Sequence, residues 1–473
     1  MGLLVSVIFK SHVQKGSGMK VKKAFPLLLL TGLVICIPPG AWSGPAPYVP
    51  VDTQDLSNVV EHTSSKPGAT RSRGTSVRSF RFDHGAGEPT LGVNADGDVF
   101  AILMDASILS DGRAIFRTTD QGNTWTDVRP YVGPVDAHPL SLDPYLFLDD
   151  TEGADRLFSI DLYVACSELS FSDDKGATWT HNPLACGEPV NDHQTLFAGR
   201  PISSPTLNYP NILYYCFNHP GFTKCNKSLD GGLTFIPTTN IVSLNCTGLN
   251  GHGISDSKGT IYVPINGCGV PTVAISHDEA NTWEVIAVSD LRMPEIGPGV
   301  DPSVAVDTKG NLYYVFGART QGAPLITPML TVSKDGGKSW SDPVKIAPPG
   351  VKTVNLVTVD AGKPGHVAVA YYGSSTGREW SGYLAIGTNV LGPRPTFSTG
   401  AVNPPSKPIK RGTCGPGRCG QVFDFIDVEI DPFGRPWGVF VDACLEECER
   451  TGQESASDSQ GLVATMIGGT PLK

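Results

Sequence analysis

The chain lacks several features that would assign it to a common functional class. It has no glycine-rich phosphate-binding loop, no paired CxxC zinc motif and no Gly-x-Ser-x-Gly nucleophile elbow. Only 17% of its 473 residues are charged, and no block of Lys and Arg occurs in the body of the chain. The net charge of −10 disfavours nucleic acid and anionic membrane as partners, because both repel an acidic surface.

The apolar run near the N-terminus is too short to cross a membrane. It extends from Ala24 to Ile37, is interrupted by Pro and Gly, and follows three Lys residues. This order is typical of a secretory signal, with Met19 as the natural start, residues 1–18 as an upstream extension and cleavage near Ser43. We therefore expect a secreted or periplasmic protein without membrane insertion.

Cysteines occur in close pairs. Removal of residues 1–43 leaves ten of the 11 cysteines and, because it removes five Lys and no acid, moves the net charge to −15. An even number in an exported chain favours disulfides over metal ligation, the alternative near the last pair. The predicted bridges join nearest neighbours: Cys166/Cys186, Cys216/Cys225, Cys246/Cys268, Cys414/Cys419 and Cys444/Cys448.

Glycine and proline are abundant, with 54 and 39 residues, as expected for many short strands joined by turns. Residues 44–75 are rich in Pro, Ser, Thr and charge without an apolar period, and they are expected to form a flexible leader. Strand patterning begins at 76–82. A single domain is expected over 76–473.

One eight-residue pattern, Ser/Thr-x-Asp-x-Gly-x-Thr/Ser-Trp/Phe, recurs five times. The copies are 118–125, 172–179, 228–235, 276–283 and 333–340, and Ala280 replaces the Gly in the fourth of these. Their central Asp residues are 48 to 57 positions apart. A regular period of this size indicates repeated supersecondary units.

The pattern is that of a tight turn. The Asp side chain can accept hydrogen bonds from backbone N–H groups two or three residues on, and the Gly takes a positive φ. The aromatic residue then begins the next strand and covers the neighbouring apolar layer. Each copy therefore predicts a hairpin between two outer strands, a structural role.

A second repeat consists of an apolar strand, a short Asp/Gly turn and another apolar strand. Seven such hairpins begin at Glu88, Asp143, His193, Asn250, Asp301, Val354 and Phe425. The last unit is one strand short, and the strand at 76–82 can supply it and close a ring, which removes exposed edges. The predicted fold is an all-β, seven-bladed propeller, with six blades as the alternative.

The repeated turns are Asp-boxes, also called BNR repeats, and the chain resembles the sialidase-like family of secreted β-propellers. The resemblance implies a propeller fold and a carbohydrate-active protein, with a sialidase-like glycoside hydrolase acting on extracellular glycans as the leading function. A fold hosts many functions, so a non-catalytic glycan- or protein-binding propeller and a polysaccharide lyase remain alternatives.

The first strand of each hairpin should line the central channel, so residues near its start should converge at one mouth. The candidate catalytic residues in these positions are Glu88, Asp143, His193, His252, Asp301 and Asp427. The candidate substrate-binding residues are Tyr145, Arg200, Arg411 and Arg418, the last two from the long segment 398–424. Crowded carboxyl and imidazole groups would have shifted pKa values, although Asp-Pro turns and a water-filled channel mouth also explain such residues.

A sialidase uses a Tyr–Glu nucleophile pair, an acid/base Asp and three Arg that bind the substrate carboxylate. Matching candidates are Tyr371 or Tyr372 with Glu379, Asp105 or Asp111, and Arg81, Arg319 and Arg378. A lyase would use His193, His252 or Tyr145 as base and Arg200 as the cation. No cofactor is expected to be required; the acidic residues would suit a structural Ca²⁺, and we expect a monomer.

Overall fold

Antiparallel strands joined by short turns make up the computed structural model. It describes residues 47–64, 68–104, 113–130, 143–163, 166–182, 185, 191–219, 221–243, 247–294, 301–319, 325–413, 424–452 and 459–473. Pro45–Lys473 form one compact unit. The predicted signal segment, Asp105 and Asp111 lie outside the described residues.

Four sheets each consist of four strands that follow one another in the chain. These are β5 (Thr90–Val93), β6 (Val99–Met104), β7 (Arg113–Thr118) and β8 (Thr126–Asp127); β9 (Pro144–Asp149), β10 (Arg156–Tyr163), β11 (Cys166–Ser172) and β12 (Thr180–Asn182); β13 (Asp192–Gly199), β14 (Ile212–His219), β15 (Phe222–Ser228) and β16 (Asn240–Ser243); and β22 (Ser303–Val306), β23 (Leu312–Arg319), β24 (Ile326–Ser333) and β25 (Val344–Lys345). A fifth sheet contains β17 (Thr247–Asn250), β18 (Ile254–Ser255), β19 (Ile261–Gly267), β20 (Val270–Ser276) and β21 (Glu284–Ala287).

A sixth sheet joins the two ends of the described chain. Its order is β31 (Asp427–Ile430), β32 (Pro436–Asp442), β33 (Gln460–Ile467), β4 (Ser76–Arg81) and β1 (Asp52–Leu56). Val463 pairs with Phe80 in the antiparallel register of β33 and β4. The predicted closure by the strand at 76–82 is therefore confirmed.

The remaining sheet is enlarged to seven strands. It contains β26 (Thr353–Ala361), β27 (Val367–Ser374), β28 (Glu379–Thr388), β29 (Thr396–Ala401), β2 (Val60–Thr63) and β3 (Ala69–Arg71), while β30 (Lys410–Arg411) pairs with β28. The six sheets of four or five strands are the regular blades of the propeller. The predicted number of blades was seven, and six was the alternative. The expected flexible leader is also corrected, because residues 52–71 contain three paired strands: β1 pairs with β4, β2 with the distant β29, and β3 with β2.

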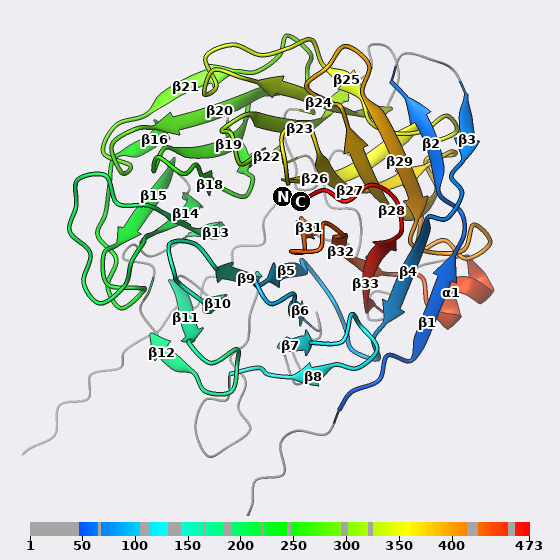
Figure 1. Cartoon of the computed structure of the whole chain (residues 1–473), viewed down its shortest axis with the longest axis horizontal. Coiled ribbons are helices and arrows are strands. Elements are labelled where there is room, and N and C mark those ends of the chain that lie inside the picture. The colour runs from blue at the N-terminus through cyan, green and yellow to red at the C-terminus, as the bar shows by residue number, and fades with distance from the viewer. Residues whose placement is uncertain are drawn as a thin grey trace, which may run out of the picture. The chain divides into compact units, whose positions relative to one another are not determined.

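The first strands of the hairpins contact one another in a closed ring, in the order β5, β9, β13, β18, β22, β26, β31 and back to β5. All seven predicted hairpins are present among the described strands. Figure 1 shows the sheets radiating from a common centre, where the C-terminal end of the chain also lies. This arrangement directs one face of every inner strand toward a central channel.

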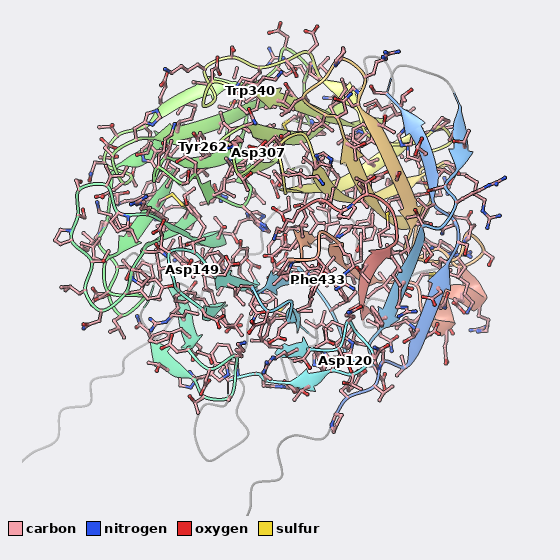
Figure 2. All side chains as sticks on the ribbon, viewed as in Figure 1. Asp120, Asp149, Tyr262, Asp307, Trp340 and Phe433 are labelled. Atoms are coloured by element: carbon pink, nitrogen blue, oxygen red, sulfur yellow. A yellow bond between two sulfur atoms is a disulfide. The ribbon has the colours of Figure 1, made fainter. Side chains whose placement is uncertain are left out.

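The five repeated turns connect the two outer strands of their sheets, as predicted. In each turn the Asp carboxylate accepts from the backbone N–H four residues on, at 2.7 to 2.9 Å. In the turn of Asp230 it also accepts from the N–H three residues on, as predicted, at 3.1 Å. The preceding Ser or Thr hydroxyl accepts from the backbone N–H of the Gly or Ala position. Figure 2 shows Asp120 and Trp340, from two of the turns, in the outer part of the ring.

The apolar core lies between neighbouring sheets, because most inner and middle strands are buried on both faces. Large aromatic side chains join the sheets: Phe80 of the closing strand packs edge-on against Trp125 and stacks on Trp437. This layer connects the sheet that begins at β5 to the sheet that closes the ring.

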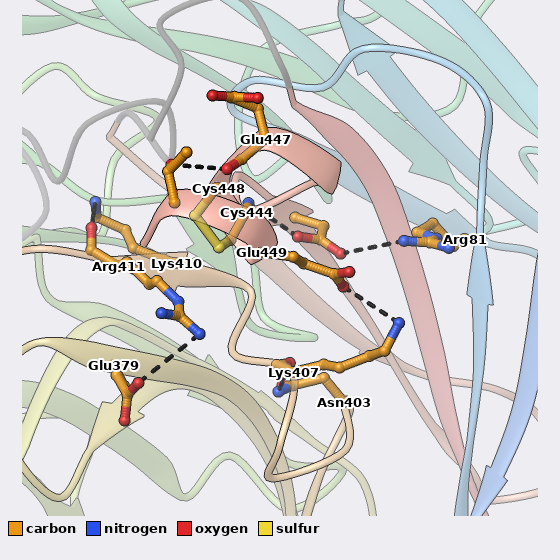
Figure 3. Close-up of a disulfide and its surroundings, with 12 residues drawn as sticks. Arg81, Glu379, Asn403, Lys407, Lys410, Arg411, Cys444, Glu447, Cys448 and Glu449 are labelled. Atoms are coloured by element: carbon orange, nitrogen blue, oxygen red, sulfur yellow. Dashed lines mark hydrogen bonds and ion pairs between the residues drawn. A yellow bond between two sulfur atoms is a disulfide. The ribbon is translucent and has the colours of Figure 1, made fainter. Parts of the chain in front are cut away.

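Two of the predicted disulfides are observed, Cys216–Cys225 and Cys444–Cys448. The second holds the short helix α1 (Glu446–Thr451) against the strand ends, as Figure 3 shows. Cys268 is disulfide-bonded, while its predicted partner Cys246 lies outside the described residues. Cys186, Cys414 and Cys419 also lie outside them, so the bridges of Cys166/Cys186 and Cys414/Cys419 stay predictions. Among the described helices, none has the length and apolar character needed to span a membrane.

Candidate functional site

A channel of about 290 Å³ runs through the centre of the ring, between the inner strands. Its polar lining residues are gathered from five strands and the chain end. They include Tyr145, His252, Asp360, Asp427, Glu429 and Lys473. Asp360, Asp427 and Glu429 are half-buried, whereas Asp150 and Lys473 are exposed, so these two residues mark an end of the channel open to solvent.

Asp427 and Glu429 lie two residues apart on β31, so strand geometry directs both toward the channel. The Asp427 carboxylate accepts from the backbone N–H of Leu91 at 3.0 Å and of Val428 at 2.9 Å. Burial raises the pKa of Asp427 to about 7, and the negative charge of Asp360 adds to this, against the effect of the two N–H donors.

Glu429 has the more strongly shifted carboxyl group of the pair. Burial raises its pKa well above the ordinary value, and the neighbouring Asp427 and Asp360 charges raise it further. Lys473 opposes this shift but does not cancel it. The surroundings of Glu429 therefore favour its protonated form, while Asp427 loses its proton as the pH rises through about 7.

The ammonium of Lys473 lies on the carboxylate side of the channel. It donates to the carbonyl oxygen of Ile430 and lowers the pKa values of Asp150 and Asp360. Burial nevertheless leaves both pKa values raised. The described channel lining thus holds more carboxyl groups than cations, which favours neutral or cationic ligands over anionic ones.

A small cavity of about 20 Å³ lies beside the channel and is lined by His193, His252, Asp301 and Phe425. His193 Nε2 forms an ion pair with the Asp301 carboxylate at 3.1 Å, and both side chains are buried. Burial alone would lower the pKa of His193, but Asp301, with Asp424 and Asp143, raises it to about 9. Burial raises the pKa of Asp301 above its ordinary value, and the charge of His193 and its hydrogen bond oppose this shift.

Glu88 and Asp143 lie behind this ion pair. The Asp143 carboxylate accepts from the backbone N–H of His193 at 3.4 Å and interacts with the Glu88 carboxyl group. Burial raises the pKa of Asp143, and the charge of Asp192 adds to the shift. Glu88 is 1% exposed, so the two carboxyl groups support the site from within and do not face the channel.

Phe425 brings the two imidazole rings together. Its ring lies 5.4 Å from that of His193 and 5.2 Å from that of His252, both edge-on, which places the two histidines less than 12 Å apart. His252 also contacts Tyr145, with ring centroids 4.9 Å apart. Burial lowers the pKa of His252 to about 3 and the His193 charge contributes, so His252 is neutral at pH 7.

Backbone strain marks the same end of the inner strands. Glu88, His193 and Leu356 have φ values of 50°, 49° and 48°, which non-glycine residues rarely adopt. The register of the strand also shifts at His193 and at Leu356, as in a β-bulge. Such outliers gather at functional sites, where bulges re-aim side chains.

The predicted residues thus separate into three groups. His193, His252 and Asp301 line the small cavity; Tyr145, His252 and Asp427 line the channel; Glu88 and Asp143 lie behind them. The predicted arginines are elsewhere: Arg200 is exposed near Glu152, and Arg411 pairs with Glu379 on β28, as Figure 3 shows. Arg418 lies outside the described residues.

The sialidase-like candidates do not converge. Arg81 lies 3.8 Å from Asp52 and 3.9 Å from Asp442 on the closing sheet, while Arg319 and Arg378 are exposed at the ends of other strands. Tyr371 is buried against Tyr383, and the Tyr372 hydroxyl is bound to the backbone of Val441. In the part of the chain that the structure describes, no arginine lines either cavity.

Glu429 was not among the predicted site residues. The candidate site residues occupy the first and third positions of each hairpin. Glu429 occupies the fifth position of its hairpin, on the same strand face. The other hairpins hold Gly92, Phe147, Phe197, Ile254, Ala305 and Thr358 at this position. The charged residue in an otherwise uncharged series was the signal that could have found it.

Among the described residues, no group of three or more His, Cys, Asp or Glu side chains is arranged to hold a metal ion. The structural Ca²⁺ stays a prediction.

No protein-family model and no curated protein matches the chain. Solved structures similar to it include a protein of unknown function from Dyadobacter fermentans, with 13% identity over 88% of this chain and 99% of that one and a TM-score of 0.42. The NanB sialidase of Streptococcus pneumoniae has 13% identity over 80% and 67%, with a TM-score of 0.42. The Aleuria aurantia lectin, in complex with Fucα1-6GlcNAc, has 12% identity over 66% and 95%, with a TM-score of 0.42.

Proposed function

We propose that the chain is a secreted, carbohydrate-active propeller of the Asp-box type that hydrolyses glycosidic bonds of extracellular glycans. Glu429 acts as the general acid and Asp427 as the general base. The observation that carries the proposal is the pair of adjacent channel carboxyl groups whose environments raise their pKa values by different amounts. Two carboxyl groups with separated pKa values are the requirement for acid–base hydrolysis of a glycoside.

As part of the proposal, Glu429 and Asp427 flank the scissile bond and the anomeric carbon is inverted. Inverting glycosidases hold their carboxyl groups about 6.5–9.5 Å apart, which leaves room for the attacking water. Glu429 would protonate the leaving oxygen while ionised Asp427 removes a proton from that water. Asp427 then releases this proton to solvent and Glu429 takes one up from solvent, which restores both groups.

The charge of the channel selects the substrate class. Ionised Asp427 repels an anionic sugar, and Lys473 is the single ammonium in the described lining. A sialoside or a uronate needs a cationic pocket for its carboxylate, and the described Arg candidates lie apart. We therefore propose a neutral or amino sugar as substrate, rather than the sialoside that the family resemblance implied.

Secretion follows from the N-terminal signal pattern and agrees with the two observed disulfides. Cleavage near Ser43 and the monomeric state stay predictions.

The test uses the chain from residue 44 onward with a panel of chromogenic neutral, amino and sialic acid glycosides. We expect turnover of a neutral or amino glycoside that rises as the pH passes about 7, because Asp427 ionises, and falls at higher pH, because Glu429 ionises. Asp427→Asn and Glu429→Gln should each lower kcat by about 10²–10⁴-fold. Glu284→Gln, an exposed control, should leave it unchanged.

Two outcomes would contradict the proposal. Glycan binding without turnover by the unmodified protein, across the pH range, would identify a binding propeller. Turnover that neither channel variant reduces would place the chemistry elsewhere in the chain.

A further inference from the structure

The small cavity beside the channel has the size of a single water site. Its volume of about 20 Å³ slightly exceeds the roughly 10–15 Å³ that one water requires. His252, Ser303 and Thr358 line both this cavity and the channel, so they form the wall between the two. A ligand of the cavity would therefore act directly on a residue that faces the channel.

Two residues that line the cavity carry buried polar atoms that need a partner. Nε2 of His252 and Oδ1 of Asp301 have no hydrogen-bond partner in the described structure, while Oδ2 of Asp301 pairs with Nε2 of His193 at 3.1 Å. Asp301 is only 9% exposed. Buried polar atoms in folded proteins are nearly always hydrogen-bonded, and an unsatisfied one costs about 1–3 kcal/mol.

We infer that the cavity binds one structural water, which donates one hydrogen bond to the Asp301 carboxylate and one to Nε2 of His252. The bridge makes Asp301 a positioning residue for His252. Nε2 of His252 then accepts a hydrogen bond from the water, so it carries no proton. The proton of the neutral imidazole must therefore be on Nδ1, because the hydrogen bond of one ring nitrogen sets the state of the other. His252 is thereby fixed as a neutral hydrogen-bond donor.

The surrounding charges support this assignment. His193 is an imidazolium faced by Asp301, Asp424 and Asp143, which come from separate segments of the ring. Its positive charge opposes protonation of His252. A neutral water is the ligand that satisfies an acceptor nitrogen and a carboxylate together without adding charge to this balance.

One part of this inference rests on the proposed function, namely the role of His252 toward a glycan. As a fixed hydrogen-bond donor at the channel wall, His252 would bind a sugar hydroxyl or ring oxygen. His252→Phe keeps the ring contacts with Tyr145 and Phe425 but removes the donor. We expect it to weaken glycan binding in the channel by about tenfold, the effect of one hydrogen bond.

The direct test is a high-resolution crystal structure of the chain from residue 44 onward, with ¹⁵N-histidine NMR in solution. We expect density for one water within hydrogen-bond distance of Asp301 and of Nε2 of His252. The NMR spectrum should show His252 as the neutral Nδ1–H tautomer at pH 7 and His193 as an imidazolium, with His366, which is on the surface, as the internal reference. Absence of that density, or a His252 that is charged or carries its proton on Nε2, would overturn the inference.

Asp301→Asn gives a second readout. Loss of the carboxylate should lower the pKa of His193 from about 9, because Asp301 is the charge that raises it most, and His252 should lose its single tautomer. An unchanged His252 spectrum in a folded variant would refute the bridge. The crystal structure and the NMR spectra need no turnover. If the water is present but the protein hydrolyses no glycoside, only the proposed hydrolase activity is rejected and the water site stands.

Discussion

Carboxylate side chains in this protein have opposite pKa shifts because their immediate partners differ. Glu279 is fully buried, and its Oε1 accepts from the backbone N–H groups of Ile202, Ser203 and Ser204 at 2.7 to 3.0 Å. Burial would raise its pKa, but these donors and the Ser204 hydroxyl lower it to about 2. Glu429 has carboxyl neighbours instead of such donors, so burial and repulsion raise its pKa.

Glu279 is therefore predicted to act in stability rather than in chemistry. It clamps the 202–204 loop of the neighbouring sheet and pairs with Lys227 at 3.7 Å. Glu279→Gln leaves Lys227 without its counter-charge and should destabilise the fold by about 2–4 kcal/mol at pH 7. The carboxylate's contribution is complete above its unfolded pKa of about 4.5 and is lost as the pH falls toward 2, because the folded pKa is depressed.

Urea unfolding at pH 7 and at pH 3 tests this prediction. The difference between the unmodified protein and Glu279→Gln should shrink at the lower pH, while the exposed Glu284→Gln should match the unmodified protein at both. A difference that is constant with pH would show that the charge of Glu279 is not what stabilises the loop.

The repeated turn is the element on which the outer part of each sheet depends. Its Gly has a φ of 87° to 98° in four copies, and the residue before it is also left-handed. Ala280 takes the same place in the remaining copy with a φ of 64°. Backbone strain alone costs a non-glycine residue about 1 kcal/mol at this position of the turn. The space left by the neighbouring sheet therefore decides whether the turn tolerates a side chain.

Two glycines with similar backbone strain separate these effects. A Cβ at Gly122, with φ 90°, would lie 2.3 Å from the Phe80 ring, whereas Gly310, with φ 81°, has nothing within 4 Å. Gly310→Ala should cost about 1 kcal/mol and Gly122→Ala about 2–4 kcal/mol, because only the second also overpacks the core. Equal losses of unfolding free energy in chemical denaturation would mean that the contact between Gly122 and Phe80 of the closing strand adds nothing to the cost.

At the scale of the whole molecule, local patterns in the sequence predict the repeats well. The five turns, the seven hairpins and two disulfides are each set by residues close in sequence or by a fixed period, and the closing strand follows from the strand that the last repeat lacks. The strand β2 escaped prediction because its partner is distant: Val60 pairs with Thr399, more than 300 positions away. The resulting enlargement of one sheet is also why the count of regular blades was wrong.

The candidate site was predictable only in part, for a related reason. Alternation along a strand identifies which residues face the channel, and it placed Tyr145, His252 and Asp427 there. It does not show how deep a residue lies, so Glu88 and Asp143 were grouped with residues that reach the channel. Arg200 and Arg411 were assigned from loop proximity alone, and each pairs locally with a carboxylate instead.

Ring closure should make the described propeller unfold as one unit. Phe80 is fully buried on β4, between β33 and β1, and its ring contacts Trp125 of the first sheet and Trp437 of the last. Phe80→Ala should therefore cost about 3–5 kcal/mol, as for other buried aromatic residues, and shift a single transition. Phe433→Ala, the same change at a ring that is 57% exposed and that Figure 2 shows near the centre, should cost less than about 1 kcal/mol.

Thermal unfolding, followed by tryptophan fluorescence and by circular dichroism, shows whether the sheets unfold together or separately. For Phe80→Ala we expect the two curves to coincide at a lower midpoint, because opening the ring at one place exposes strand edges throughout it. An early transition confined to one signal, with the rest unfolding as in the unmodified protein, would mean that the sheets are stable without closure.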